Sequence, residues 1–192
     1  MIDFFRFICI FQIITMLVIL SASLYSKEMN NPKGPKLIIS YTLHRISRMA
    51  SNQIAVWIED SSGKLVRTLY VTNFTAKGGY ARRAESLDTW VKKADWENAT
   101  KDQVDAISGA TQSPGKKSIT WDCRDSNGKI VPKGKYFYNI EGNIYWDNKV
   151  FVKGEILIGD KKINSKADLI YVPKDASQYG ILIEDVSAEY YP

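Results

Sequence analysis

Short runs of β-branched and aromatic residues, each stopped by a turn signal, constrain this chain more than any other feature. Two of the turns share one chemistry, because DSSG at 60–63 and DSNG at 125–128 both place Asp first and Gly fourth. That arrangement fits a type I turn whose Gly adopts the left-handed conformation. Elements this short, with turns this frequent, favour strands over helices.

About nine short strands are expected along the chain. The clearest runs are rich in residues that suit a pleated, half-buried surface. They are 36–43, 53–60, 64–72, 117–122, 135–141, 148–158, 167–172 and 181–190. This pattern predicts an all-β fold, an immunoglobulin-like antiparallel β-sandwich.

One segment in the middle of the chain breaks the strand pattern. ESLDTWVKKADW, residues 85–96, places apolar residues at helical spacing, and Ser86 stands where a helix N-cap is expected. The apolar positions are Leu87, Trp90, Val91 and Ala94. Such a stripe usually packs on the protein's own core rather than serving as a recognition surface. We therefore expect one short helical insertion that covers the sheet.

The first 26 residues are expected to direct export rather than to fold. The apolar run ICIFQIITMLVIL follows Arg6 and ends in the small residues SAS, which is typical of a signal peptide cleaved after Ser23 or Ser26. The run is almost long enough to span a bilayer, so an uncleaved anchor is the alternative. Residues 27–35 then form a polar tether, and 36–192 a single β-sandwich domain outside the cytoplasm.

Cysteine and charge indicate a domain held by its hydrophobic core. Cys9 lies in the export segment, so Cys123 would be the only cysteine of a mature chain, and no internal disulfide can form. A buried free thiol is expected there. The net charge of +5 is mild and the lysines are scattered. That distribution indicates a solvated surface rather than a nucleic-acid site.

The residue types of common catalytic and metal sites do not gather in this sequence. The one histidine, His44, has no Cys or His cluster of zinc spacing near it. The carboxylate pairs Glu59–Asp60 and Glu184–Asp185 are adjacent in expected strands, so the members of each pair should point to opposite faces. We therefore expect neither an enzyme nor a metal site.

Two runs of motifs resemble known families. WDCRDSNGKIVPKGKYFYNIEG, residues 121–142, resembles the core hairpin of the immunoglobulin-like domain in bacterial flagellar hook-cap proteins, although Cys123 replaces the usual glycine. A wider run is similar to the bacterial predicted periplasmic proteins called domain of unknown function 2271. It comprises IAVWIEDSSGKLVRTLYV, a glycine loop, a Trp-bearing helix, DAISGAT-x-x-PG and W-D-x-x-D-x-x-G.

These resemblances imply different roles. The wider one covers most of residues 36–158 and implies a non-enzymatic accessory or binding module. Its protein partner would lie at or in the cytoplasmic membrane, in a flavin or haem redox system. The hook-cap resemblance implies a surface or appendage scaffold instead. Membrane contact is expected only through an uncleaved N-terminus, and the oligomeric state stays open.

The stretch DAISGAT, residues 105–111, is also similar to the flavin-attachment motif D-x-x-[ST]-G-A-[ST] of extracytoplasmic flavoproteins. The matching positions are Asp105, Ser108, Gly109, Ala110 and Thr111. In that motif a transferase joins the phosphate of FMN to the last hydroxyl, so Thr111 would carry the flavin and the chain would be an electron carrier. Gly109 and Ala110 would leave room for the transferase. No other cofactor is expected.

Two features of DAISGAT keep a purely structural interpretation open. Ser-Gly-Ala-Thr before Pro-Gly is ordinary loop composition, and Asp105 and Ser108 could simply bond to backbone amides. A bound isoalloxazine would also need aromatic walls. Tyr80, Trp90 and Trp96 are near in sequence, but rings of this kind are usually core.

Overall fold

The computed structural model describes residues 34–192, which fold into nine strands and six short helices. The strands are β1 (Lys36–Leu43), β2 (Ile54–Asp60), β3 (Leu65–Thr72), β4 (Ser108–Gly109), β5 (Gly115–Trp121), β6 (Gly134–Tyr145), β7 (Asn148–Ile158), β8 (Ile163–Val172) and β9 (Ile183–Tyr191). The helices are α2 (Asn73–Ala76), η1 (Gly79–Ala81), α3 (Asp88–Lys93), η2 (Trp96–Asn98), α4 (Lys101–Ile107) and η3 (Ala176–Tyr179). The expected export segment 1–26 and residues 27–33 of the expected tether lie outside the described residues.

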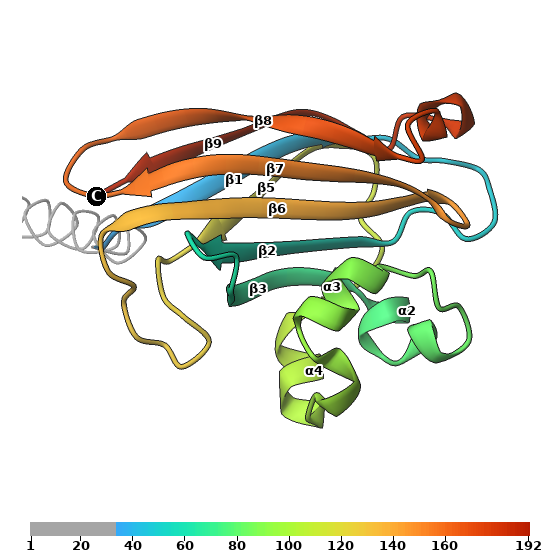
Figure 1. Ribbon diagram of the computed structural model, residues 1–192, viewed down its shortest axis with the longest axis horizontal. Helices are drawn as coiled ribbons and strands as arrows, with labels where there is room; N and C mark the ends of the chain where they lie inside the picture. Colours follow the sequence, from blue (N-terminus) through green and yellow to red (C-terminus); the bar gives the residue numbers. More distant parts are fainter. Residues whose placement is uncertain (1–33) are drawn as a thin grey trace, which may run out of the picture. The chain divides into compact units, whose positions relative to one another are not determined.

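One sheet in the order β4-β3-β2-β6-β7-β8-β9-β1-β5 curls on itself to make the sandwich (Figure 1). The strand β8 joins the two halves, because residues 163–166 pair with β9 whereas residues 167–172 pair with β7. All strand pairs are antiparallel except the short parallel contact between β3 and β4. The predicted all-β, sandwich-like fold is confirmed. Within residues 34–192, no helix has the length and apolarity needed to cross a membrane.

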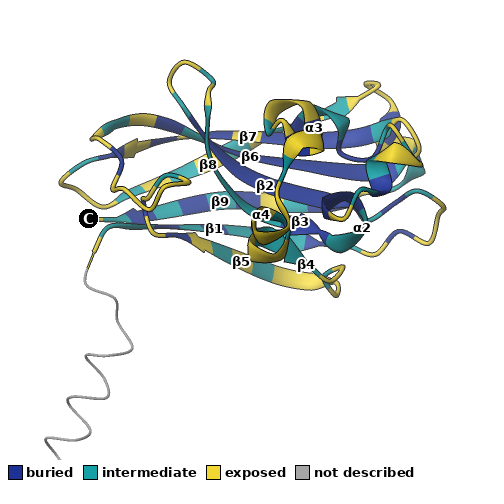
Figure 2. Ribbon diagram, turned by 90° about the horizontal axis from the view of Figure 1, so that it is seen from below, coloured by how far each residue is buried: buried dark blue, intermediate teal, exposed yellow. Residues whose placement is uncertain are grey.

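The main core lies between the two halves of the sheet (Figure 2). In β1 every second side chain is buried, which is the period expected for a strand with one face inward. Large rings such as Trp121 and Tyr138 fill the centre. Cys123 is a buried free thiol in this core, as predicted, and burial raises the pKa of the thiol to about 12.

A second core lies between the helices and the outer face of β2 and β3. Trp90 and Leu87 are fully buried there against Trp57 and Val71. The expectation that the apolar stripe covers the sheet is therefore confirmed. The expected helical insertion is present, but it comprises five short helices between β3 and β4 rather than one. Left-handed residues at Gly78, Leu87 and Asp95 break the segment into pieces.

The predicted N-cap of α3 is also wrong. Ser86 is buried, and its hydroxyl pairs with Thr75 and accepts a hydrogen bond from Arg83. The helix starts at Asp88, and the amides of its first turn instead donate to the carboxylate of Glu141 on β6. A partner from the sheet has replaced the local cap.

The two Asp–Gly turns form as predicted. In the first turn, Asp60 Oδ1 accepts hydrogen bonds from the amides of Ser62 and Lys64. In the second turn, Asp125 Oδ1 accepts hydrogen bonds from the amides of the residues two and four positions after it. Their glycines adopt φ of +82° and +77°. The strands on either side of the second turn do not pair, because β5 and β6 lie in different parts of the sheet order. The resemblance to a hook-cap hairpin is therefore not confirmed.

The prediction that Glu184 and Asp185 point to opposite faces is wrong. A register shift in the pairing of β1 with β9 coincides with a left-handed Asp185, at φ +54°. Such a bulge places two successive side chains on the same face. Glu184 pairs with His44 at 2.7 Å and Asp185 accepts a hydrogen bond from Thr42 at 3.3 Å.

Candidate functional site

The five residues of the predicted flavin-attachment motif form one continuous surface segment. Asp105 lies in α4, Ser108 and Gly109 form β4, and Ala110 and Thr111 begin the loop to β5. Asp105, Ala110 and Thr111 are exposed, and the other two are half-buried. The structure thus presents the end of the motif to solvent.

The glycine of the motif has a reason within the fold. Gly109 pairs with Thr72 at the edge of the sheet, and the ring of Tyr70 lies directly against it. A Cβ at Gly109 would come within 2.5 Å of that ring, closer than any side chain tolerates. The glycine is therefore required for packing, whether or not a transferase also needs the space.

Two tyrosines fasten the chain on either side of Thr111. The hydroxyl of Tyr70 donates to the carbonyl of Ala110 at 2.6 Å, and the hydroxyl of Tyr41 donates to Gln112 Oε1 at 2.7 Å. Burial raises the pKa of Tyr70 to about 12 and raises that of Tyr41 further. Both phenols are therefore protonated donors at neutral pH, and they hold the segment while leaving Thr111 outward.

The side chain of Thr111 itself is free. Its hydroxyl makes no hydrogen bond with any part of the chain that the structure describes, and the residue is exposed. The alternative role of Asp105 and Ser108, hydrogen bonding to backbone amides, does not occur among residues 34–192. A free hydroxyl on a fastened loop is the geometry that a modifying enzyme needs.

The aromatic residues near the motif in sequence do not surround Thr111. Trp90 and Trp96 are core, as expected, with ring centroids 4.9 Å apart and exposures of 0% and 7%. Tyr80 and Trp96 line a separate hollow of about 450 Å³ together with Asp105. Asp105 therefore opens onto a different hollow from the one beside Thr111.

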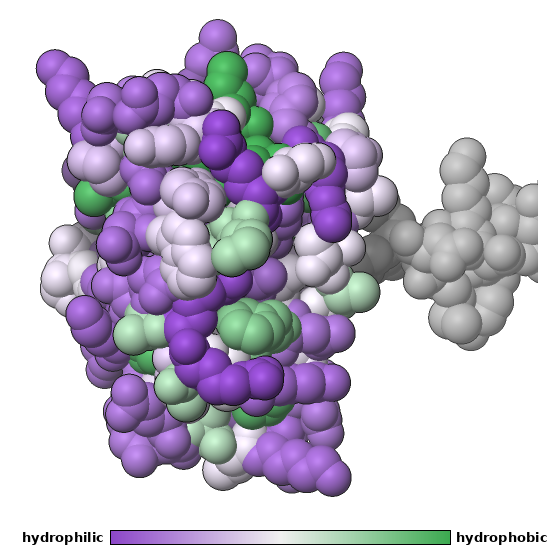
Figure 3. All heavy atoms as spheres, turned by 90° about the vertical axis from the view of Figure 1, so that its right-hand side faces the viewer, coloured by the Kyte–Doolittle hydropathy of each residue, from purple (hydrophilic) through white to green (hydrophobic). Residues whose placement is uncertain are grey.

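Thr111 lines a hollow of about 470 Å³ on the loop between β1 and β2. The rest of its lining comes from nine consecutive residues: Arg45, Ile46, Ser47, Arg48, Met49, Ala50, Ser51, Asn52 and Gln53. Figure 3 looks onto the end of the sandwich that carries this loop, where hydrophilic residues surround separate hydrophobic patches. We name this region the arginine hollow.

The arginine hollow was not predicted from the sequence. Its loop separates two strands, and the hydrogen bonds that shape it join residues through their side chains rather than through a familiar turn. One signal was present, because no acidic residue occurs between Lys36 and Ile58 although two arginines do. Such a run of unopposed positive charge is a sequence-level indication of an anion site.

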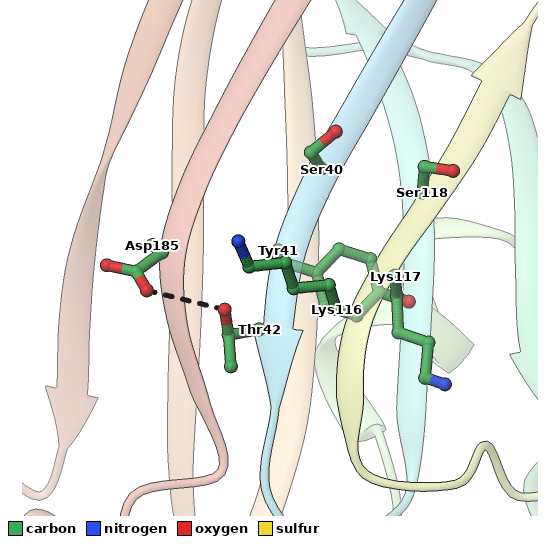
Figure 4. A pocket seen from close by; sticks show the side chains of 7 residues that line it. All are labelled: Ser40, Tyr41, Thr42, Lys116, Lys117, Ser118 and Asp185. Carbon is green, nitrogen blue, oxygen red and sulfur yellow. Dashed lines mark hydrogen bonds between the residues drawn. The ribbon is translucent and has the colours of Figure 1, made fainter.

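A polar groove of about 510 Å³ follows the outer surface of β1, β5 and β9 (Figure 4). The Lys116 side chain extends across β1 on the side of Asp185, whereas Lys117 points away. The Thr42–Asp185 hydrogen bond forms one wall. The groove shares Tyr41 with the Thr111 segment, but its other side chains are those of an ordinary solvated strand face.

A buried ion cluster holds the helices to the sheet and was not predicted. Glu141 is fully buried and accepts the Trp90 amide at 2.8 Å. Lys149 lies 3.5 Å from Glu141 and pairs more closely with Asp88. Burial raises the pKa of Glu141 to about 7 and lowers that of Lys149. The cluster lines a hollow of about 440 Å³, but Glu141 itself does not reach it.

Metal-binding geometry does not occur in the part of the chain that the structure describes. No group of three His, Cys, Asp or Glu side chains lies close enough to hold an ion there. The accessible hydroxyl of Thr111 fits covalent attachment of FMN, whereas the residues that line its hollow include no aromatic wall for the flavin ring.

Comparison with known proteins adds one finding. A family model described as "Predicted periplasmic protein (DUF2271)" matches residues 37–170, which is more than half of the chain. Neither the curated proteins nor the solved structures give a significant match. The matched span contains β1 to β7, most of β8, the Thr111 segment and the arginine hollow.

Proposed function

The chain belongs to this family of predicted periplasmic proteins, and from that premise we propose that it is an exported, non-enzymatic binding module serving a membrane-bound flavin or haem redox system. The observation that carries the proposal is the display of Thr111. Two tyrosines fasten its neighbours while its own hydroxyl stays exposed and unbonded. A loop held in one conformation loses little entropy when a partner binds it.

The described carboxyl group with a raised pKa, Glu141, supports a non-enzymatic role. A general acid or base must reach its substrate, and a carboxyl group in that role often has a raised pKa. Glu141 has the displaced pKa, but it is fully buried and both its oxygens serve the first turn of α3. Its environment is that of a structural cap.

The partner is tested by copurification from the host envelope after mild crosslinking. We expect the wild-type protein to bring down a membrane protein with flavin or haem absorbance, and Thr111→Arg to lose it because the large side chain blocks the loop surface. Ser113→Arg, in the same loop and also exposed, is the matched control. Recovery of no membrane protein, or equal recovery with Thr111→Arg, would contradict the proposal.

A second function, an electron carrier with FMN on Thr111, is favoured by the arginines that share the hollow with this hydroxyl. In the attachment step Thr111 loses its hydroxyl proton and its oxygen forms a bond to the flavin phosphorus. With a flavin dinucleotide as the donor, the bond from that phosphorus to the bridging pyrophosphate oxygen breaks, a nucleoside monophosphate leaves, and the hydroxyl proton passes to a base of the transferase. The product is a phosphodiester with one negative charge. Arginine side chains are suited to neutralise such a charge.

The flavin is tested by the intact mass of protein purified from its own host. We expect an added mass equal to FMN minus water in the wild type, retained in Thr111→Ser and absent from Thr111→Ala. Because Thr111 makes no contact that holds the fold, both variants should fold normally. An unmodified wild-type mass, from a host that flavinylates other proteins, would rule out this function and leave the binding module standing.

A further inference from the structure

Two arginines of the arginine hollow lack a negative partner. Arg45 makes no ion pair or hydrogen bond with any residue from 34 to 192, and Arg48 uses only its Nε, which donates to the carbonyl of Tyr179 at 3.1 Å. Elsewhere in the described chain Arg67, Arg83 and Arg124 pair with carboxylates, whereas Arg82 contacts the Phe74 ring. Unopposed cations in one hollow favour a negative ligand.

The guanidinium of Arg48 is oriented in advance. It stacks on the rings of Tyr145 and Tyr179, at 5.4 Å from each centroid, and these rings lie 5.3 Å from each other. Stacking and the Nε hydrogen bond fix the plane of the group and leave both terminal nitrogens without a hydrogen-bond partner among residues 34–192. A guanidinium group held in this way loses less conformational entropy on binding a ligand than a freely rotating side chain would.

Side-chain hydrogen bonds cross-link the loop beneath the arginines. The side chain of Asn52 accepts the Ile46 amide at 3.0 Å and donates to the Ile46 carbonyl at 2.7 Å. The Ser51 hydroxyl donates to the Arg48 carbonyl at 2.7 Å. Ala50 and Asn52 are held in the left-handed conformation, at φ of +55° and +60°. Strain of this kind, retained by surrounding bonds, is common where a loop binds a ligand.

The chemistry of the lining selects the ligand. No acidic residue lines the arginine hollow, whereas two arginines and the hydroxyl-bearing residues Ser47 and Thr111 do. Guanidinium forks match the oxygens of phosphate in geometry and charge, and hydroxyls add donors. The volume of about 470 Å³ exceeds what a phosphate alone needs, and Met49 is 69% exposed beside it, which leaves room for an organic group.

We infer that the arginine hollow is a phosphate-binding site, in which Arg45 and Arg48 hold a phosphate monoester or diester beside Thr111. The phosphate of a flavin attached to Thr111 is one source, and that case alone rests on the proposed function. A phospholipid headgroup and a free phosphate ester are the other two sources. In each case the site binds the same group with the same two arginines.

The test is a titration of the purified, unmodified chain followed by NMR, with three probes: inorganic phosphate, free FMN, and vesicles of phosphatidylglycerol or of phosphatidylcholine. We expect saturable binding of at least one phosphate probe, with shifts in residues 44–53. Arg45→Gln should weaken it by about tenfold, and Arg45→Gln with Arg48→Gln by more, because each removes a charge-assisted pair. Arg82→Gln is the matched control. Arg82 is exposed and stacks on Phe74 outside the hollow.

Each arm has a defined outcome. Binding of free FMN but not of vesicles identifies a soluble ester, and binding of phosphatidylglycerol vesicles alone identifies a headgroup. Arg48→Gln could disturb the stacked tyrosines, so Arg45→Gln, which removes no hydrogen bond or ion pair among the described residues, keeps the test decisive. No saturable binding, or equal binding by Arg45→Gln and wild type, overturns the inference. Thr111→Ala should bind within about twofold of wild type, so failure of flavin attachment does not decide this result.

Discussion

The Asp–Gly turns and the helical insertion satisfy their free backbone amides in different ways. At Asp60 and Asp125 the residue that opens the turn also satisfies its amides, two and four positions later. At α3 the amides are satisfied by Glu141, more than fifty positions along the chain. The strand framework is thus specified locally, whereas the insertion takes its shape from the sheet beneath it.

A second residue of β6 also supplies hydrogen bonds to the insertion. Asn143, also on β6, accepts the Leu87 amide at 3.1 Å and donates to the Glu85 carbonyl at 3.0 Å. Both cap residues on β6 are fully buried. Buried hydrogen bonds of this kind cost more to break than exposed ones, because a lost partner leaves a polar group without water. The insertion should therefore be the region more sensitive to single substitutions.

The largest expected effect is at the second core. Trp90→Ala should destabilise the protein by about 3–5 kcal/mol, because it removes a fully buried ring that packs against Trp96. Native-state hydrogen exchange should show faster exchange across residues 73–107 and nearly unchanged exchange in β6 and β7. An equal loss of protection in both regions would mean that insertion and framework unfold as one unit.

A smaller effect is expected from pH, through Glu141. Burial raises its folded-state pKa from 4.5 to about 7, so the folded protein binds a proton more readily than the unfolded chain. Its contribution to stability is therefore fully present below about pH 4.5 and lost as pH rises through about 7. Glu141→Gln should reduce this dependence, by at most about 3 kcal/mol.

The measurement is the free energy of unfolding in urea at several pH values between about 4 and 8. Glu155→Gln is the control, since Glu155 is an exposed carboxylate that pairs with Lys135 on the same two strands. An identical pH profile for Glu141→Gln and wild type would show that Lys149 keeps the carboxylate charged throughout. The buried cap would then differ from the local caps in its burial and not in its effect on the pH dependence of stability.

The smallest effects are expected at the turns. Asp60→Ala should cost about 1 kcal/mol, because two amides lose an exposed acceptor. Ser62→Asn converts DSSG into the DSNG of the second turn and should change stability by less than about 0.5 kcal/mol. Both are measured by urea unfolding. A loss from Ser62→Asn as large as that from Asp60→Ala would show that the two turns are not locally equivalent.

Most strands were predictable because their signals are local. Alternating burial in β1 follows directly from its sequence, and glycine at 63 and 128 meets a conformational requirement of the turn itself. The bulge at Asp185 was not predictable, because nothing in the dipeptide Glu-Asp distinguishes a regular strand from one with an extra residue. The start of α3 was missed for a related reason: its cap comes from β6.

The candidate site also has one part that could be predicted from local sequence and one part that could not. The DAISGAT motif could be found because its five matching positions lie within seven consecutive residues. The structure keeps these positions together. The arginine hollow could not be found from a motif. It depends on Tyr145 and Tyr179, which approach Arg48 only after β6, β7 and η3 have packed, and on Thr111 reaching the loop from beyond the insertion.

The place of β1 has a consequence for how the protein reaches the periplasm. β1 lies between β9 and β5, the last strand of the chain and one from its middle. A chain that crosses the membrane from its N-terminal end presents β1 early and β9 last, so one side of β1 stays unpaired until translocation is nearly finished. Pairings this distant in sequence form slowly. The strand order therefore delays closure of the sandwich until β9, the last strand of the chain, is available to pair with β1.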